Sequence, residues 1–165
     1  MEREKDVKIA IGCDEAACEL KEVIKKHLLG KGHELLDFGT HNNHPVLYPD
    51  IAVAVAEAIA WGQHDRGILL CGTGIGMAIS ANKVIGIRAA QAHDTYSAER
   101  AAKSNNAQII TLGARVIGPE LAKSIVDHFL NSRFSGGNSA KKVDAIAEYE
   151  RLRKILSDRS DLPPV

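Results

Sequence analysis

Residues 67–76 read GILLCGTGIG, a short apolar run followed by a loop with three glycines in five residues. An apolar run bounded by turn residues is typical of a strand that is buried on both faces of a parallel sheet. Glycine adopts the tight backbone turns that such a loop requires. We therefore predict a buried strand over Gly67–Leu70 and a helix over Met77–Asn82, joined by the glycine-rich loop.

The same alternation of short apolar runs and longer segments of helical period extends along the chain in both directions. The predicted strands are Val7–Gly12, Glu34–Phe38, Gly67–Leu70, Ile87–Ala92 and Gln108–Leu112. The predicted helices between and after them are Ala16–Leu29, Ile51–Ala60, Met77–Asn82, Tyr96–Lys103 and Glu120–Asn131. This order is typical of βαβ units, so we expect an α/β fold with a five-stranded parallel sheet.

A C-terminal helix is predicted over Ala140–Leu156, after the sheet is complete. Its apolar residues lie at helical spacing and form a stripe made of Val143, Ile146, Ala147 and Leu152. The stripe packs either on its own domain or on a neighbouring subunit. We expect residues 1–157 to form a single domain and residues 158–165 to be a disordered tail.

The composition of the 165-residue chain excludes several classes of protein. Twenty-one basic and 21 acidic residues give a formal net charge of zero, which argues against a nucleic-acid or anionic-membrane partner. Residues 1–13 have no apolar segment before Val7, so we expect no signal peptide, and no segment is apolar enough to span a membrane. The three cysteines Cys13, Cys18 and Cys71 are an odd number at unrelated spacings, which excludes a disulfide scaffold and a zinc ribbon. We expect a cytoplasmic protein with reduced thiols.

The carboxyl ends of the predicted strands identify the candidate site, because ligands of open parallel sheets bind there. The strand at Gly67–Leu70 leads into Cys71, which the oriented amides of the loop would favour as a thiolate for catalysis. The alternative is that Cys71 is only a small buried apolar side chain. A cysteine phosphatase is excluded because Met77 stands where its arginine is required, and the loop does not have the glycine spacing of a dinucleotide site.

Other strand ends carry further candidates. Asp14 follows the first strand and either orients a substrate hydroxyl or caps the first helix. At the end of the fourth strand, His93 and Asp94 form an acid–base pair, or Asp94 caps the next helix. Two histidines in a polar loop, His41 and His44, are too few for a metal site, so we expect no metal.

Several segments together resemble the type B ribose-5-phosphate isomerases and their galactose-6-phosphate isomerase relatives. They are CGTGIGMAISANKVIGIRAA (71–90), GCDEAACELK (12–21), Tyr48-Pro49-Asp50, HDTYSAERA (93–101), NNAQ (105–108) and GARVIG (113–118). The resemblance covers about residues 7–155. It implies a Rossmann-like three-layer sandwich, aldose–ketose isomerisation without metal or cofactor, and a homodimer, or a tetramer, with active sites at the subunit interface.

The resemblance also implies roles for individual residues. Cys71 matches the general base of the family, and Thr73 matches its enediolate cradle together with the amides of three loop glycines. Those glycines are Gly72, Gly74 and Gly76. Asp14, Tyr48 and Asn105 match positions that contact substrate, and Arg115 matches an arginine on the phosphate side. The physical chemistry agrees, because an enediolate intermediate requires a base and fixed donors around the developing oxyanion.

The chain departs from the family pattern at positions that bear on the substrate. Glu15 replaces a common histidine, Asn138 and Lys142 replace two phosphate-binding arginines, and Ser104 replaces the histidine that opens the sugar ring. A tetrose 4-phosphate has no free hydroxyl with which to close a furanose, so an isomerase for this substrate does not require the ring-opening histidine. We therefore expect erythrulose 4-phosphate as substrate, with Lys142 on its phosphate. The alternative is ribose 5-phosphate with His93 as the ring-opening acid, and a further one is a module that binds sugar phosphates without catalysis.

Overall fold

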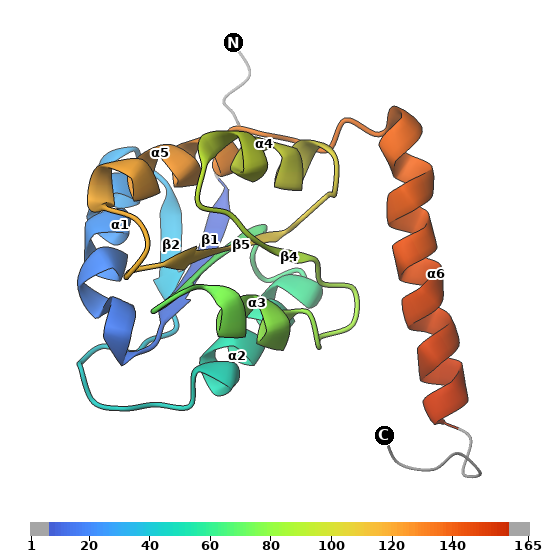
Figure 1. Cartoon of the computed structure of the whole chain (residues 1–165), viewed down its shortest axis with the longest axis horizontal. Coiled ribbons are helices and arrows are strands. Elements are labelled where there is room, and N and C mark those ends of the chain that lie inside the picture. Colours follow the sequence, from blue (N-terminus) through green and yellow to red (C-terminus); the bar gives the residue numbers. More distant parts are fainter. Residues whose placement is uncertain (1–6, 159–165) are drawn as a thin grey trace.

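The computed structural model describes residues 7–158 and has a five-stranded sheet at its centre (Figure 1). The strands are β1 (Lys8–Cys13), β2 (Glu34–Asp37), β3 (Arg66–Cys71), β4 (Ala89–Gln91) and β5 (Ile109–Gly113). All pairings are parallel, and the order across the sheet is β2-β1-β3-β5-β4. The predicted parallel sheet is confirmed, with the strand before the glycine-rich loop in the middle.

Helices cover both faces of the sheet and make the expected three-layer sandwich. They are α1 (Cys18–Gly30), α2 (Tyr48–Ala60), α3 (Ile75–Ala81), α4 (Thr95–Lys103), α5 (Pro119–Leu130) and α6 (Ala140–Ser157), with short 3₁₀ turns η1 (Glu15–Ala17) and η2 (Gly137–Ser139). Helices α1, α4 and α5 share one apolar cluster with the sheet, and α2 and α3 share a second cluster on the other face. The Rossmann-like α/β fold is confirmed.

Alternate residues of each inner strand supply these two clusters, which explains why the strands are continuously apolar. In β1, Ile9 and Ile11 pack under α1 and α5, whereas Ala10 faces α2. In β3, Leu70 belongs to the first cluster and Cys71 to the second. Successive side chains of a strand point to opposite faces, so a strand covered on both sides needs apolar residues throughout. This alternation places the Cys71 side chain on the α2 and α3 face.

Several element boundaries differ from the prediction. Helix α2 begins at Tyr48 rather than Ile51, because Pro49 occupies its first turn, so Tyr48 lies on a helix and not in the preceding loop. The first helix is preceded by η1 and starts at Cys18 instead of Ala16. Strand β4 keeps only three of the six residues predicted over Ile87–Ala92, since Ile87 still belongs to a turn and the strand pairs on one side only.

Helix α6 confirms the predicted C-terminal helix and stands beside the sandwich instead of covering the sheet (Figure 1). Of its predicted apolar stripe, Val143 is buried, whereas Ile146 is 52% exposed and Leu152 is 42% exposed. The Glu150 carboxylate accepts a hydrogen bond of 2.9 Å from the Gly86 amide. Much of the apolar surface of α6 is therefore unpartnered in a single chain. Residue 158, the first of the predicted tail at 158–165, caps the end of α6, and the rest of that tail lies outside the described residues.

Candidate active site

The carboxyl ends of β1, β3 and β5 meet at one edge of the sheet and bring the candidate residues together. Cys71 is the last residue of β3, and in the strand register it lies beside Gly113 at the end of β5. On the other side of β3, Leu70 lies beside Cys13, so Asp14 follows directly at the same edge. The Cys71 side chain is 5% exposed, which shields its sulfur from bulk water.

The glycine-rich loop wraps around the sulfur atom of Cys71. The amide of Gly74 donates a hydrogen bond of 3.0 Å to Cys71 Sγ. Gly74 has a φ of +79°, and a Cβ on it would lie 3.0 Å from the backbone of Leu112, so no other residue fits there without strain. Its carbonyl accepts a hydrogen bond of 2.9 Å from the buried Thr111 hydroxyl. The loop is thereby fixed with an N–H group aimed at the sulfur.

Thr73 is held at the apex of this loop by contacts on both sides. Its hydroxyl accepts a hydrogen bond of 3.3 Å from the Ile75 amide, and its carbonyl accepts one of 2.6 Å from Gln91 Nε2. A Cβ on Gly113 would lie 2.8 Å from the Thr73 backbone, so the two segments touch. The position of the Thr73 hydroxyl therefore depends on the end of β5 as well as on its own loop.

Tyr48 and Arg115 flank the loop, each resting on a glycine. A Cβ on Gly76 would lie 2.6 Å from the Tyr48 ring, and a Cβ on Gly72 would lie 3.4 Å from the Arg115 guanidinium. Arg115 is exposed, with its charge at the rim of the site. The predicted proximity of both side chains to the loop is therefore observed, and each glycine leaves the space that the larger side chain fills.

Asp14 caps η1 at the end of β1. Its carboxylate accepts a hydrogen bond of 3.0 Å from the Ala16 amide, so the capping interpretation is confirmed. Burial raises the pKa of the Asp14 carboxyl above its ordinary value, and the positive charge of Arg115 partly opposes this shift. The capping contact uses Oδ1, so a substrate hydroxyl would meet the other oxygen. The substrate role of Asp14 stays a prediction.

Within the described part of the chain, His93 and Asp94 form no hydrogen bond or ion pair with each other. The Gly113 amide donates a hydrogen bond of 3.0 Å to His93 Nε2, which requires the ring nitrogen to be unprotonated. Asp94 accepts a hydrogen bond of 2.6 Å from the Ser97 amide and caps α4, and this bond lowers the pKa of its exposed carboxyl. Of the two interpretations of Asp94, the structure therefore supports the helix cap.

Asn105 and Lys142 lie away from the loop, although the family resemblance assigns both to the substrate. Asn105 follows α4 and lines a cavity of about 420 Å³ together with Ala89, the first residue of β4, so it lies near the amino edge of the sheet. Ile146 of α6 lines the same cavity, and exposed Lys142 is one turn before it. Within one chain, neither residue joins the Cys71 site.

Sequence reasoning missed three residues that shape the site: Gln91, Thr111 and Gly113. Thr111 is fully buried and is the only polar residue in the apolar run of β5, which is the signal that identifies it in retrospect. Gln91 and Gly113 carry no comparable signal. They become recognisable only when β4 and β5 are placed beside the loop.

The described part of the chain holds no cluster of metal-binding side chains. No group of three or more histidine, cysteine, aspartate or glutamate side chains there has the geometry to hold a metal ion. His41 and His44 are both exposed in the loop after β2. None of the helices described here is long and apolar enough to cross a membrane.

Comparison with known proteins identifies the family. The model of the Ribose/Galactose Isomerase family matches residues 9–146. The Ribose-5-P isomerase B of Listeria innocua is 58% identical over 148 residues, which are 90% of this chain and 100% of that protein. The D-erythrulose-4-phosphate isomerase of Pectobacterium atrosepticum is 59% identical over 148 residues, 88% of this chain and 97% of that protein.

A solved structure agrees with this result. The ribose-5-phosphate isomerase B of Clostridium thermocellum superimposes with a TM-score of 0.87 at 47% identity, covering 88% of this chain and 99% of that one. The parallel sheet with helices on both faces is therefore the fold of a known class of enzymes. The chain belongs to the ribose/galactose isomerase family of sugar-phosphate isomerases.

Proposed function

We propose that the enzyme interconverts an aldose phosphate and a ketose phosphate through an enediolate, with Cys71 as the general base. The observation that carries this proposal is the shielded Cys71 sulfur, which accepts a hydrogen bond from the Gly74 amide. The thiolate removes a proton from the carbon beside the carbonyl, and the electron pair moves to the carbonyl oxygen. The thiol then returns the proton to the neighbouring carbon. A proton also passes between the two oxygens, so no electrons are gained or lost overall.

The surroundings of Cys71 supply the donors that an enediolate requires. The amides of Gly72 and Gly76 and the Thr73 hydroxyl border the loop, whereas the Gly74 amide is already engaged with the sulfur. Fixed donors around a developing oxyanion lower the barrier because they need no reorganisation during the reaction. Asp14 has a carboxyl pKa raised by burial, which suits it to hold or relay a substrate hydroxyl proton.

For the substrate we favour erythrulose 4-phosphate, with ribose 5-phosphate as the second candidate. Ribose 5-phosphate exists largely as a ring that an acid must open, and the serine hydroxyl of Ser104 is too weak an acid for this step. Nε2 of His93 accepts a hydrogen bond from the Gly113 amide, so only its Nδ1 is left to serve as the acid. A tetrose 4-phosphate forms no furanose and requires no ring opening. The relatives named for ribose 5-phosphate and for erythrulose 4-phosphate are 58% and 59% identical to this chain. The preference therefore rests on Ser104 and His93.

A second copy of the chain would complete the site. Asn105 and Lys142 lie away from Cys71 within one chain, at the edge of the sandwich where α6 stands. The exposed apolar side chains of α6, among them Ile146, Tyr149 and Leu152, are suited to cover a neighbouring subunit. We infer a homodimer in which these two residues reach the substrate of the partner.

The test compares kcat/KM for erythrulose 4-phosphate, ribulose 5-phosphate and ribose 5-phosphate in the wild type, Ser104→His and Ser104→Ala. We expect the wild type and Ser104→Ala to have their highest kcat/KM with erythrulose 4-phosphate. We expect Ser104→His to increase kcat/KM mainly for ribose 5-phosphate. Ribulose 5-phosphate is the control, because it has five carbons and no furanose to open. If the wild-type kcat/KM is tenfold higher for ribulose 5-phosphate, about 1.4 kcal/mol of transition-state binding, erythrulose 4-phosphate is not the preferred substrate. Binding of all three without turnover identifies a non-catalytic module.

A further inference from the structure

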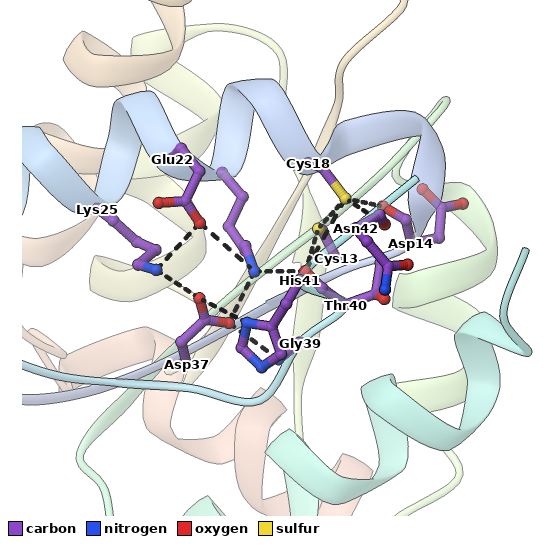
Figure 2. Close-up of polar contacts among 11 residues, drawn as sticks. Cys13, Asp14, Cys18, Glu22, Lys25, Asp37, Gly39, Thr40, His41 and Asn42 are labelled. Carbon is purple, nitrogen blue, oxygen red and sulfur yellow. Dashed lines mark hydrogen bonds and ion pairs between the residues drawn. The ribbon is translucent and has the colours of Figure 1, made fainter. Parts of the chain in front are cut away.

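Two cysteines outside the proposed catalytic loop lie in contact with each other. Cys13 ends β1 and Cys18 begins α1, and their Sγ atoms are 3.8 Å apart (Figure 2). Asp14 and η1 form the short connection between the two residues. Cys13 is fully buried, whereas Cys18 is only partly buried beside the loop after β2. One sulfur of the pair therefore faces the exterior more than the other.

Polar groups border the pair on one side, and the apolar cluster under α1 borders it on the other. The Cys18 thiol donates a hydrogen bond of 3.0 Å to the Asn42 carbonyl, and Cys13 lies 3.7 Å from the Thr40 carbonyl. The buried Lys21 ammonium donates to the same Thr40 oxygen at 2.6 Å, which places a positive charge close to Cys13. A positive charge stabilises the thiolate that forms during oxidation or exchange of a thiol.

The two thiols differ in their reactivity toward an oxidant. Burial raises the pKa of the Cys13 thiol to about 12, an effect that the Lys21 charge only partly offsets. Cys13 is thus a protonated thiol at neutral pH and reacts poorly by itself. Cys18 is more accessible, so a hydroperoxide reaches its sulfur first.

We propose that Cys13 and Cys18 form a reversible disulfide when a hydroperoxide oxidises the protein. The Cys18 thiolate attacks the peroxide oxygen, the O–O bond breaks, and Cys18 becomes a sulfenic acid while the peroxide is reduced to water or an alcohol. The Cys13 sulfur then attacks the Cys18 sulfur, the S–O bond breaks, and water leaves with the Cys13 proton. The two sulfurs together lose two electrons, which the peroxide gains. A dithiol reductant reverses the change.

The disulfide alters the substrate site through Asp14. A disulfide bond is about 2.05 Å long, so the sulfurs approach each other from 3.8 Å and the first turn of α1 moves toward β1. The Cys18 hydrogen bond to Asn42 is then lost, and the η1 turn that Asp14 caps is displaced. Reversible loss of isomerase activity is the expected consequence, and this part rests on the proposed function.

Trypsin separates the pair from the catalytic cysteine, which makes the chemistry measurable without activity. Residues 9–21 form one tryptic peptide that contains Cys13 and Cys18, and residues 67–83 form another that contains Cys71. We expect hydrogen peroxide to remove two hydrogen atoms from the 9–21 peptide and to block both of its thiols against alkylation, with full recovery after dithiothreitol. The proposal is overturned if the peptide keeps two free thiols while Cys71 oxidises, or if Cys18 proceeds to a sulfinic acid.

Matched variants separate the disulfide from damage at Cys71. Cys18→Ser removes one partner with little change in size, and we expect it to keep the basal activity and to lose the dithiothreitol-reversible phase of inactivation. Cys13→Ala gives a second variant for the same comparison. An equal reversible phase in Cys18→Ser contradicts the proposed coupling to the active site. If no phosphosugar is turned over at all, the proposed function fails, while the peptide masses still decide whether the disulfide forms.

Discussion

At the scale of single residues, the site depends on close approaches that only glycine permits. Gly74 meets the Leu112 backbone, and Gly113 meets the backbone of Thr73. These approaches place one amide on the Cys71 sulfur and hold Thr73 at the loop apex. The chemistry of the loop is therefore set by backbone packing as much as by the cysteine itself.

Gly113→Ala tests this dependence. The new Cβ would lie 2.8 Å from Thr73, so the loop must shift, and overpacking of this kind destabilises a protein by about 1–3 kcal/mol. We also expect kcat to fall by about tenfold or more, since a small displacement of catalytic groups is costly. Urea unfolding and steady-state kinetics measure the two effects.

The matched control is Gly30→Ala, at the last residue of α1, where a Cβ meets nothing within 4 Å. It should leave kcat unchanged and alter stability by about 1 kcal/mol at most. If Gly113→Ala behaves like this control, the contact between β5 and Thr73 has no part in the site.

At the scale of elements, a buried ion pair joins α1 to β2. The Lys21 side chain is fully buried, and its ammonium donates to Asp37 at 2.8 Å and to the Thr40 carbonyl at 2.6 Å. Burial by itself would raise the pKa of Asp37, but hydrogen bonds from Lys21 and Lys25 outweigh it and hold the pKa below its ordinary value. The pair thus fixes the loop after β2 to the helix that begins at Cys18.

Asp37→Asn leaves the Lys21 charge without its partner. Removal of one member of a buried pair costs about 3–5 kcal/mol, and we expect a loss of this size in urea unfolding at about pH 7. Asp127→Asn is the control: it removes contacts to the half-exposed Lys31 and to His27, leaves no fully buried charge, and should cost about 1 kcal/mol.

The effect of pH has a definite sign. An aspartate with a lowered pKa contributes its stability above its unfolded pKa of about 3.9 and loses it as the pH falls through the folded value. The difference between wild type and Asp37→Asn should therefore shrink from about pH 4 downward. A difference that stays constant to about pH 2 contradicts the ion-pair account.

The elements also show how far the sequence predicts the fold. Apolar runs and glycines predicted the five strands and that the sheet is parallel, because burial on both faces leaves a clear compositional signal, but they did not predict the strand order. Helix starts were less accurate, as at Tyr48 and Cys18, because Pro49 and the η1 turn adjust the first turn locally. The Lys21 pair was not predicted, since a lysine on a helix is normally exposed and only the position of Asp37 explains its burial.

At the scale of the whole molecule, the residues assigned to the site lie in two places within one chain. The loop, Asp14, Tyr48 and Arg115 gather at the carboxyl edge of the sheet, whereas Asn105 lies at the opposite edge, toward α6. Strand ends predicted the first group, because topology within one chain fixes them. Asn105 was identified by resemblance alone, and the proposed dimer would explain why spacing in one sequence does not place it at the site.

Mixing inactive subunits tests the shared site. A Cys71→Ala subunit and an Asn105→Ala subunit are each expected to be inactive as homodimers. In a mixed dimer one site receives both intact residues, so random exchange should restore up to about a quarter of the wild-type activity. Subunit exchange is verified by intact mass of the assemblies. If exchange is verified and no activity is recovered, Cys71 and Asn105 act in the site of the same chain, or Asn105 is not part of the site.

The role of Cys71 is tested most directly by exchange of the transferred hydrogen with solvent. In deuterium oxide the wild type should introduce deuterium at the carbon beside the carbonyl of erythrulose 4-phosphate, because the thiol formed in the reaction exchanges its proton. Cys71→Ser should unfold like the wild type and lower both turnover and deuterium incorporation by about 10²–10⁴-fold, the usual contribution of a general base. A folded Cys71→Ser enzyme that keeps more than about a tenth of the wild-type turnover and exchange would contradict the account, because the base would then be another group.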